Sequence, residues 1–354
     1  MSNLQNGLDW QALVDIARLE RWMDAQGLGE GAISNAQALA GGTQNLLLRF
    51  QRSGGDYVLR RPPLHPRVDG NSTMRREMRV LTALTATEVP HAGFIAGCVD
   101  TEVLGSAFYL MKPIEGFNAC AEMPGLHAGD PAIRHAMGMA LADGAAALGN
   151  VDLDKVGLTD LGRLDGFLER QVPRWKGLLD SYGEFEGWAG PSALGEVEVI
   201  GRWLEERRPQ SFVPGLMHGD YHLANVMFRR DGPQLAAVVD WEMTTSGDPL
   251  VDLGWMLATW PDANGTSAGP PAPQPWGGFP SADELIARYA QGSQRDLDNV
   301  QWYAVLACYK LGIVLEGTHA RACARKAPRE TGEQLHHAAQ RLFERASQWV
   351  DSSR

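Results

Sequence analysis

Residues 216–255, LMHGDYHLANVMFRRDGPQLAAVVDWEMTTSGDPLVDLGW, contain the features on which the fold of the whole chain can be argued. His218, Asp220 and Asn225 lie in a polar loop, and an apolar run further on ends at Asp240. Apolar, strand-like runs lie on both sides of these polar residues. We therefore expect the polar side chains to lie at a strand edge beside a crevice.

This set of side chains suits phosphoryl transfer. The reaction needs a carboxylate that orients the attacking hydroxyl and oxygen ligands that hold Mg²⁺ across the phosphates. We predict that Asp220 is the catalytic carboxylate and that Asn225 and Asp240 are metal ligands. The alternative is a polar surface loop in which Asp and Asn stabilise turns and helix caps.

The stretch resembles a known family. Asp-x4-Asn followed by a strand-terminal Asp is similar to the catalytic and metal-binding segments of protein-kinase-like enzymes, and HGDYHLAN resembles the loop of the aminoglycoside-phosphotransferase family of small-molecule kinases. AVVDWE and GDPLVDLGW at family-like spacing make the resemblance specific. It implies an α+β, two-lobed kinase-like fold and Mg-ATP-dependent phosphorylation of a hydroxyl on a small molecule.

Length and composition fit this expectation. A chain of 354 residues exceeds what one core usually holds, so we predict a β-rich N-lobe at 1–113 and a larger helical C-lobe at 114–354. The net charge of −11 disfavours nucleic acid or an anionic membrane as partner. No apolar run is long enough to span a bilayer, and the four scattered cysteines suggest free thiols in the cytoplasm rather than disulfides or a zinc site.

The N-lobe is predicted to begin with a helix and three strands, at 9–26, 33–40, 46–50 and 57–60. Between the first two strands lies a loop that contains Gly41, Gly42, Thr43 and Asn45. The resemblance implies that backbone N–H groups of this loop approach the phosphates of ATP, as a glycine pair permits. An ordinary hairpin turn is the alternative.

Arg60 is the candidate for the phosphate-gripping cation. Kinases carry a lysine on the corresponding strand, but no lysine precedes Lys112 in this chain. VLRRPP resembles the branch of the family that is fused to acyl-CoA dehydrogenases, in which Arg is usual. Arginine stays charged and can bind phosphate oxygens in a bidentate manner. Arg61 is the alternative if the strand register slips by one residue.

Glu77 is the predicted partner of Arg60. In a helix over 69–86, Glu77 shares a face with Met74, Leu81 and Leu84. Its neighbours three and four residues away are uncharged, so no ion pair within the helix explains it. A carboxylate on an apolar face needs a partner from elsewhere. The alternative is a solvated Glu on a helix with another rotation.

Two more strands, at 94–99 and 107–111, complete a predicted five-stranded sheet. The resemblance implies that backbone groups around Met111 meet the adenine. The C-lobe is then mainly helical, with helices expected at 132–148, 161–179, 195–206, 282–291, 300–316 and 330–350, the second of which Pro173 should kink or split. A Pro/Gly-rich loop at 261–280 is either a substrate-side flap or a solvated insertion.

Two residues are expected to support the catalytic loop rather than react. His218 matches the structural His of kinase loops, and Asp252 resembles the family's buried Asp that braces the loop. His222 has no role assigned from the sequence.

The acceptor is the least determined part of the prediction. LEGTHARA, which contains Glu316, His319 and Arg321 and is followed by Arg325, resembles a helix that borders the acceptor side in the acyl-CoA-dehydrogenase-fused kinases. The alternative is a solvated basic helix end. We favour a hydroxyacyl-CoA acceptor. An aminoglycoside or amino alcohol, or a pseudokinase without turnover, remains the alternative, and ATP versus GTP and the oligomeric state stay open.

Overall fold

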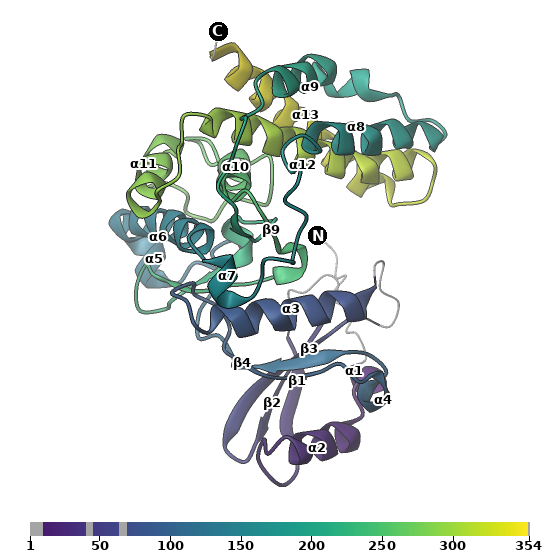
Figure 1. Cartoon of the computed structure of the whole chain (residues 1–354), viewed down its shortest axis with the longest axis vertical. Coiled ribbons are helices and arrows are strands. Elements are labelled where there is room, and N and C mark those ends of the chain that lie inside the picture. Colours follow the sequence, from purple (N-terminus) through teal and green to yellow (C-terminus); the bar gives the residue numbers. More distant parts are fainter. Residues whose placement is uncertain (1–9, 40–44, 64–68, 353–354) are drawn as a thin grey trace. The chain divides into compact units, whose positions relative to one another are not determined.

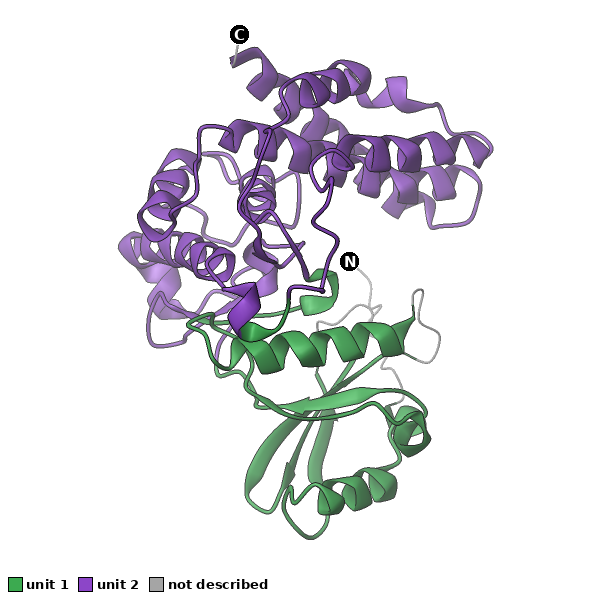
Figure 2. Cartoon of the chain, viewed as in Figure 1, with its two compact units in different colours: residues 1–115, 156–158, 236–244 green, residues 116–155, 159–235, 245–354 purple. Residues whose placement is uncertain are grey.

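The computed structural model describes residues 10–39, 45–63 and 69–352. The chain divides into two compact units (Figure 2). Unit 1 comprises residues 1–115, 156–158 and 236–244, and unit 2 comprises the remainder. The segment 236–244, which we had placed in the C-lobe, thus belongs to unit 1, where the Val238 N–H donates to the Pro90 carbonyl at 2.8 Å.

Unit 1 contains a five-stranded antiparallel sheet in the order β1-β2-β3-β5-β4 (Figure 1), which confirms the predicted sheet. Its strands are β1 (Ser34–Ala38), β2 (Leu46–Arg52), β3 (Gly55–Arg61), β4 (Phe94–Cys98) and β5 (Phe108–Met111). Its helices are α1 (Trp10–Leu13), α2 (Ile16–Ala25), α3 (Gly70–Leu84), α4 (Thr101–Leu104) and the 3-10 helix η4 (Trp241–Met243). The predicted loop residues Gly41, Gly42 and Thr43 lie outside the described residues.

The continuous helix predicted over 9–26 is wrong. The structure has two helices, α1 and α2, because Asp15 has an extended backbone and caps α2 by accepting the Arg18 N–H at 3.0 Å. An Asp at this position favours a new helix start over continuation.

Strand β3 sends alternate side chains to two different environments. Leu59 packs in an apolar cluster with α2 and the outer strands, and Arg61, two residues on, also points to this side. The Arg61 guanidinium donates to the carbonyl oxygens of Leu13 and Leu104. Arg60 points to the opposite face, because side chains alternate along a strand.

Unit 2 is mainly helical (Figure 1). Its helices are α5 (Gly125–Gly129), α6 (Pro131–Gly149), α8 (Gln171–Ser181), α9 (Val197–Glu206), α10 (Leu250–Thr259), α11 (Ala282–Gly292), α12 (Val300–Cys323) and α13 (Arg329–Ser352), with the short α7 (Leu153–Val156) and the 3-10 helices η1 (Tyr182–Glu184), η2 (Pro191–Leu194) and η3 (Leu223–Asn225) between them. Its strands are β6 (Gly215–Met217), β7 (Val226–Phe228) and β9 (Thr245–Gly247), and β8 (Leu235–Val238) leads into segment 236–244.

Helix α12 forms the centre of unit 2. It packs against α10 and along α13, and it buries a stripe of apolar and aromatic side chains: Trp302, Val305, Leu306, Tyr309 and Ile313. The helix runs seven residues beyond the predicted end at Glu316, to Cys323. Burial of apolar side chains on several faces stabilises such a long central helix.

The helix predicted over 161–179 begins later than expected. Helix α8 starts at Gln171, so Pro173 lies in its first turn and does not kink it. Proline is tolerated there because the first N–H groups of a helix have no partner within the helix.

The Pro/Gly-rich loop at 261–280 is partly exposed and is anchored within unit 2 by buried aromatic contacts. The Trp276 ring is buried, stacks on Phe279 with ring centroids 4.6 Å apart and meets Trp260 edge-on. Its Nε1–H donates to the Asp262 carbonyl at 2.8 Å. A substrate-side role for the loop stays a prediction.

Within the described part of the chain, no helix is both long and apolar enough to cross a membrane. The four cysteines, Cys98, Cys120, Cys308 and Cys323, are free thiols.

Candidate active site

Asp252 holds the loop that follows β6 through backbone hydrogen bonds. Its carboxylate is buried and accepts the backbone N–H of His218 at 2.6 Å and of Gly219 at 2.8 Å. Burial raises the pKa of Asp252, and the His218 charge and these two N–H groups oppose that shift. Gly219 has a φ of 85°, which favours glycine. The loop geometry therefore depends on Asp252.

Three side chains surround the Asp220 carboxylate. Oδ1 accepts from Trp255 Nε1 at 2.7 Å and lies 3.1 Å from His222 Nε2. Oδ2 accepts from Asn225 Nδ2 at 2.9 Å. The Asp220 side chain keeps 34% of its surface exposed, so an acceptor hydroxyl can still approach the carboxylate.

These contacts hold Asp220 in its ionised form. Burial raises the pKa of Asp220, but the His222 hydrogen bond, the favourable electrostatics of the His222 and His218 rings and the Trp255 hydrogen bond outweigh burial and lower it to about 2. At neutral pH the group is therefore a carboxylate, the form that a role in orienting an acceptor hydroxyl would require.

His222, which had no role in the sequence-based prediction, contacts Asp220 directly. The Ala224 N–H donates to His222 Nδ1 at 3.1 Å, so Nδ1 carries no proton. In the neutral ring the proton is then on Nε2, which faces Asp220 Oδ1. His222 therefore donates to the carboxylate and restricts its rotation.

Lys310 is a second residue that sequence reasoning missed. Its ammonium donates to the Gly219 carbonyl at 3.3 Å, lies 4.2 Å from the centre of the Trp255 ring and also faces the Trp175 ring at 5.4 Å. Trp255 is the residue that donates to Asp220. Lys310 thus supports the catalytic loop at two points. It is the only charged residue in 300–315, which is a signal the sequence did offer.

The pH dependence of turnover should report Lys310. Burial lowers its pKa to about 8, against the attraction of Asp252 and Asp220. As pH rises through about 8, we expect turnover to fall because Lys310 loses the charge that holds Gly219 and Trp255. Profiles of kcat/KM against pH for the wild type and for Lys310→Arg, which stays charged, measure this.

Fold stability should change in the opposite sense. The folded state binds this proton more weakly than the unfolded chain, whose lysine titrates near 10.5, so the Lys310 contribution to stability rises between about pH 8 and 10.5. A melting temperature that does not fall over the pH range in which activity falls is the expected result. An unchanged alkaline limb in Lys310→Arg contradicts it.

In unit 1, Arg60 joins two carboxylates. Its Nε lies 2.9 Å from Glu77 Oε2, and its Nη2 lies 2.9 Å from Asp240 Oδ1. Glu77 is fully buried and also accepts the Tyr109 hydroxyl at 2.7 Å. The predicted Arg60–Glu77 ion pair is thus present, and Arg61 faces elsewhere. That Arg60 and Glu77 hold ATP stays a prediction.

Electrostatics keep the Arg60 guanidinium charged. Burial alone would lower the pKa of Arg60, but the charges of Glu77 and Asp240 outweigh it and raise the pKa. A charged, planar guanidinium is the type of donor that binds phosphate oxygens.

The proposed metal ligands have suitable chemistry. Asp240 follows β8 in a left-handed backbone conformation with φ 68°, and its side chain is 41% exposed. Asn225 directs its Nδ2 to Asp220, which leaves its amide oxygen for another partner. Among the described residues, none donates to Asn225 Oδ1 or to Asp240 Oδ2. Carboxylate and amide oxygens are ligands that suit Mg²⁺.

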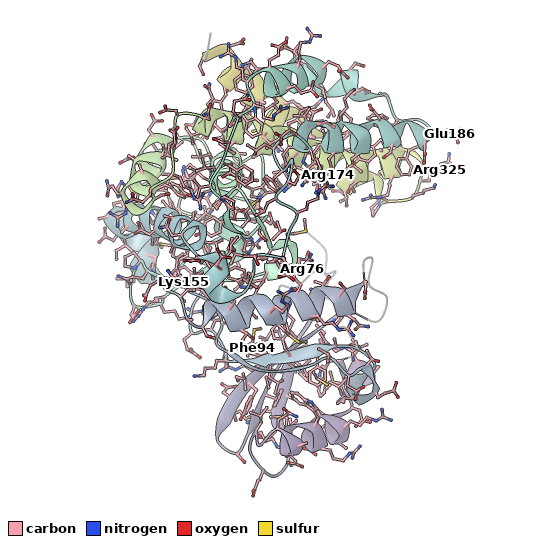
Figure 3. All side chains as sticks on the ribbon, in the orientation of Figure 1. Arg76, Phe94, Lys155, Arg174, Glu186 and Arg325 are labelled. Atoms are coloured by element: carbon pink, nitrogen blue, oxygen red, sulfur yellow. The ribbon has the colours of Figure 1, made fainter. Side chains whose placement is uncertain are left out.

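The other predicted nucleotide contacts are placed in unit 1. Asn45 Nδ2 lies 3.5 Å from Glu242 Oε2, and Arg76, labelled in Figure 3, donates to the Glu242 carbonyl at 2.6 Å. Met111 ends strand β5, where its backbone lies opposite Val58 and Phe94. Their contacts with a nucleotide stay predictions.

The residues predicted to contact the acceptor do not form one continuous surface. Glu316 is fully buried and bonded to Trp188 and His336, so its burial does not support a direct acceptor contact. Arg321 donates to Thr318 Oγ1 on its own helix. His319 and Arg325 line a cavity of about 520 Å³ together with Gly187, Ala322, Cys323, Ala327, Arg329 and Glu333. Figure 3 shows Arg325 near Glu186, where the chain turns from α12 to α13.

A second, larger cavity lies near the catalytic loop. It has a volume of about 740 Å³, and its lining includes Arg163, Arg170 and Arg174, with β9 on one side. The positive charge of Arg174, labelled in Figure 3, contributes to lowering the pKa of Lys310. Lys310 contacts the loop that contains Asp220, so Arg174 links this cavity electrostatically to that loop, although Glu169 also lines the cavity.

A carboxylate hydrogen-bonded by a nearby asparagine amide, together with a buried Arg–Glu pair in the sheet-containing unit, is the arrangement expected of a kinase-type phosphotransferase. The phosphotransferase enzyme family matches residues 35–303, well over half of the chain. The chain therefore belongs to this family, and the resemblance predicted from the sequence is confirmed.

Relatives with curated names carry this domain within longer proteins. The chain is 28% identical over 323 residues to acyl-CoA dehydrogenase family member 11 of Gallus gallus, covering 89% of this chain and 40% of that protein. It is 25% identical over 307 residues to acyl-CoA dehydrogenase family member 10 of Mus musculus, covering 83% of this chain and 27% of that protein. The chain thus spans less than half the length of these relatives.

Solved structures agree on the fold. A Ralstonia eutropha protein assigned as an aminoglycoside phosphotransferase has a TM-score of 0.77 at 26% identity, over 94% of this chain and 98% of that chain. A spectinomycin phosphotransferase, solved with ADP and spectinomycin, has a TM-score of 0.64 at 10% identity, over 93% of this chain and 98% of that chain. The second likeness shows the fold alone, which confirms the predicted kinase-like class.

Proposed function

We propose that this phosphotransferase moves the terminal phosphoryl group of ATP, bound with Mg²⁺, to an alcohol group of a small molecule, and that this molecule is a hydroxyacyl-CoA. The observation that carries the proposal is the Asp220 carboxylate, which is partly exposed, ionised and held by Trp255, His222 and Asn225. Such a group orients an acceptor hydroxyl.

Each residue has a defined part in this mechanism. Asp220 accepts the hydrogen bond of the acceptor hydroxyl and aligns its oxygen for attack. Arg60, positioned by Glu77, binds phosphate oxygens and offsets their charge. Asn225 and Asp240 would hold Mg²⁺, which when bound neutralises charge on the phosphates. His218 and Asp252 keep the loop in place, and we assign Asn45 and the backbone near Met111 to nucleotide contacts.

A catalytically inactive nucleotide-binding pseudokinase is the rival from another class. The absence of a lysine in the usual position supports it weakly, but Arg60 occupies that position and pairs with Glu77. Release of ADP that depends on an added acceptor separates the two. Nucleotide binding without turnover on hydroxyacyl-CoAs, aminoglycosides and amino alcohols would establish the pseudokinase.

The charge around the two cavities supports an anionic acceptor. The chain carries a net charge of −11, so a polyanion needs local positive charge to bind. The larger cavity offers Arg174 near Lys310, and the smaller one offers Arg325 and Arg329. Helix α12 places Cys323 about 20 Å beyond Lys310, so only a long acceptor such as a coenzyme A thioester could reach both cavities.

Removing the cavity charges should identify the acceptor class. In the double variant Arg174→Gln/Arg325→Gln we expect the KM for a hydroxyacyl-CoA to rise about tenfold or more, because charged hydrogen bonds are lost. The ATP KM should stay nearly constant. The matched control is Arg202→Gln, an exposed arginine on α9 outside both cavities. Improved binding of an aminoglycoside by the double variant would favour the polycationic acceptor instead.

A further inference from the structure

Glu316 is a buried carboxylate that the phosphotransfer site does not use. It lies on α12 with no exposed surface. Its Oε1 accepts from Trp188 Nε1 at 2.7 Å, and its Oε2 lies 2.7 Å from His336 Nδ1. Within the described part of the chain, His336 is the only basic side chain within ion-pair distance of Glu316. A buried carboxylate is stable only when a positive group compensates it.

Metal-ligand residue types gather around this carboxylate. Glu316 and His319 are three residues apart on α12 and Cys323 is four further on, so all three share one face of the helix. His336, on α13, faces them, and its ring stacks on the His319 ring with centroids 4.3 Å apart. Glu-x-x-His motifs on helices contribute ligands to the metal sites of di-iron and di-manganese helical bundles.

His319 has unused ligand capacity. Its Nδ1 is shielded from solvent and has no hydrogen-bond partner among the described residues, and its Nε2 lies 3.6 Å from Cys323 Sγ. A shielded ring nitrogen without a partner is costly unless a ligand occupies it.

We propose that Glu316, His319 and His336 bind one divalent transition-metal cation of the zinc type, with water at the fourth position. The candidate ligand atoms of these three residues lie within 4.8 Å of one another. Ligands bound to a tetrahedral zinc ion at about 2.0–2.1 Å are separated by roughly 3.3 Å, so small side-chain rotations suffice.

The cavity of about 520 Å³ gives the ion a way in, because His319 and Cys323 both line it. The sequence alone favoured free thiols over a zinc site, since it has no CxxC pair. The ligands of this site come instead from two helices that pack along each other.

The test uses the full chain, stripped of metal by a chelator and kept in excess Mg²⁺ so that hard-ligand sites are filled. Titration with Co²⁺ should give one ion per chain, with the visible absorption of tetrahedral cobalt, and Zn²⁺ should displace it. Zn²⁺ should also raise the melting temperature. His336→Ala should weaken binding at least tenfold. The matched control is His337→Ala, which removes the neighbouring exposed histidine of α13 and should bind like the wild type.

Cys323→Ser is a second control. It should bind the ion as the wild type does, because Cys323 lies outside the group of three ligand residues. Sub-stoichiometric Co²⁺ binding by the wild type, or equal affinity in His336→Ala and His337→Ala, overturns the site. Circular dichroism checks folding, and His319→Asn replaces His336→Ala if that variant is unfolded.

Discussion

Asp220→Ala should lose turnover by roughly 10²–10⁴-fold while the affinity for ATP stays nearly unchanged. The carboxylate contacts the acceptor hydroxyl in the proposed mechanism, whereas the phosphates are assigned to Arg60 and the metal ligands. Its removal also leaves the Trp255 and His222 donors without their shared acceptor. Single-turnover rates and a nucleotide-binding titration on the same protein measure the two effects separately.

The control for Asp220 is Asp231→Ala. Asp231 is an exposed aspartate of the same unit that pairs with Arg229, so its loss should leave turnover and binding intact. Near-normal turnover in Asp220→Ala would show that another group orients the acceptor.

Arg60→Ala should be the most damaging change in unit 1, for catalysis and for stability together. Glu77 has no exposed surface, so loss of Arg60 leaves a buried charge without its ion-pair partner, which costs about 3–5 kcal/mol. In the proposed mechanism the ATP KM rises and kcat falls, because an interaction with a reacting phosphate is lost. Steady-state kinetics and urea unfolding on one preparation give both quantities.

Two further variants separate the two effects of Arg60. Arg60→Met/Glu77→Met removes both charges and should recover much of the lost stability without recovering activity. Arg61→Met removes the hydrogen bonds to the Leu13 and Leu104 carbonyls and should lower stability with little change in the ATP KM. If Arg61→Met raised the ATP KM more than Arg60→Ala does, the assignment of Arg60 to the phosphates would be wrong.

Local patterns were sufficient to predict the sheet, and the Arg60–Glu77 pair needed the family resemblance as well. The apolar face around Glu77 required a distant cation, and the resemblance placed that cation on the strand that ends at Arg60. Strand alternation then separates Arg60 from Arg61, but only once the register of β3 is known. Helix ends were predicted less well, since a single cap at Asp15 outweighed the continuing apolar pattern.

The surroundings of Asp220 were harder to predict because they come from distant parts of the chain. Trp255 and Lys310 follow Asp220 by 35 and 90 positions, and no short-range rule relates them. The role of His222 depends on a side-chain orientation that a backbone N–H of Ala224 determines. A lone lysine within an apolar helix should in future be treated as a candidate for charge-dependent support of a site.

Segment 236–244 completes unit 1 although it lies late in the sequence, and this order affects folding during synthesis. A nascent chain leaves the ribosome from its N-terminus, and domains generally fold as units during synthesis. The strands of the sheet emerge first, but Asp240, the second carboxylate that Arg60 contacts, is translated long afterwards. Unit 1 therefore stays incomplete while about half of unit 2 is synthesised. We expect the nascent chain to depend most on chaperones during this interval.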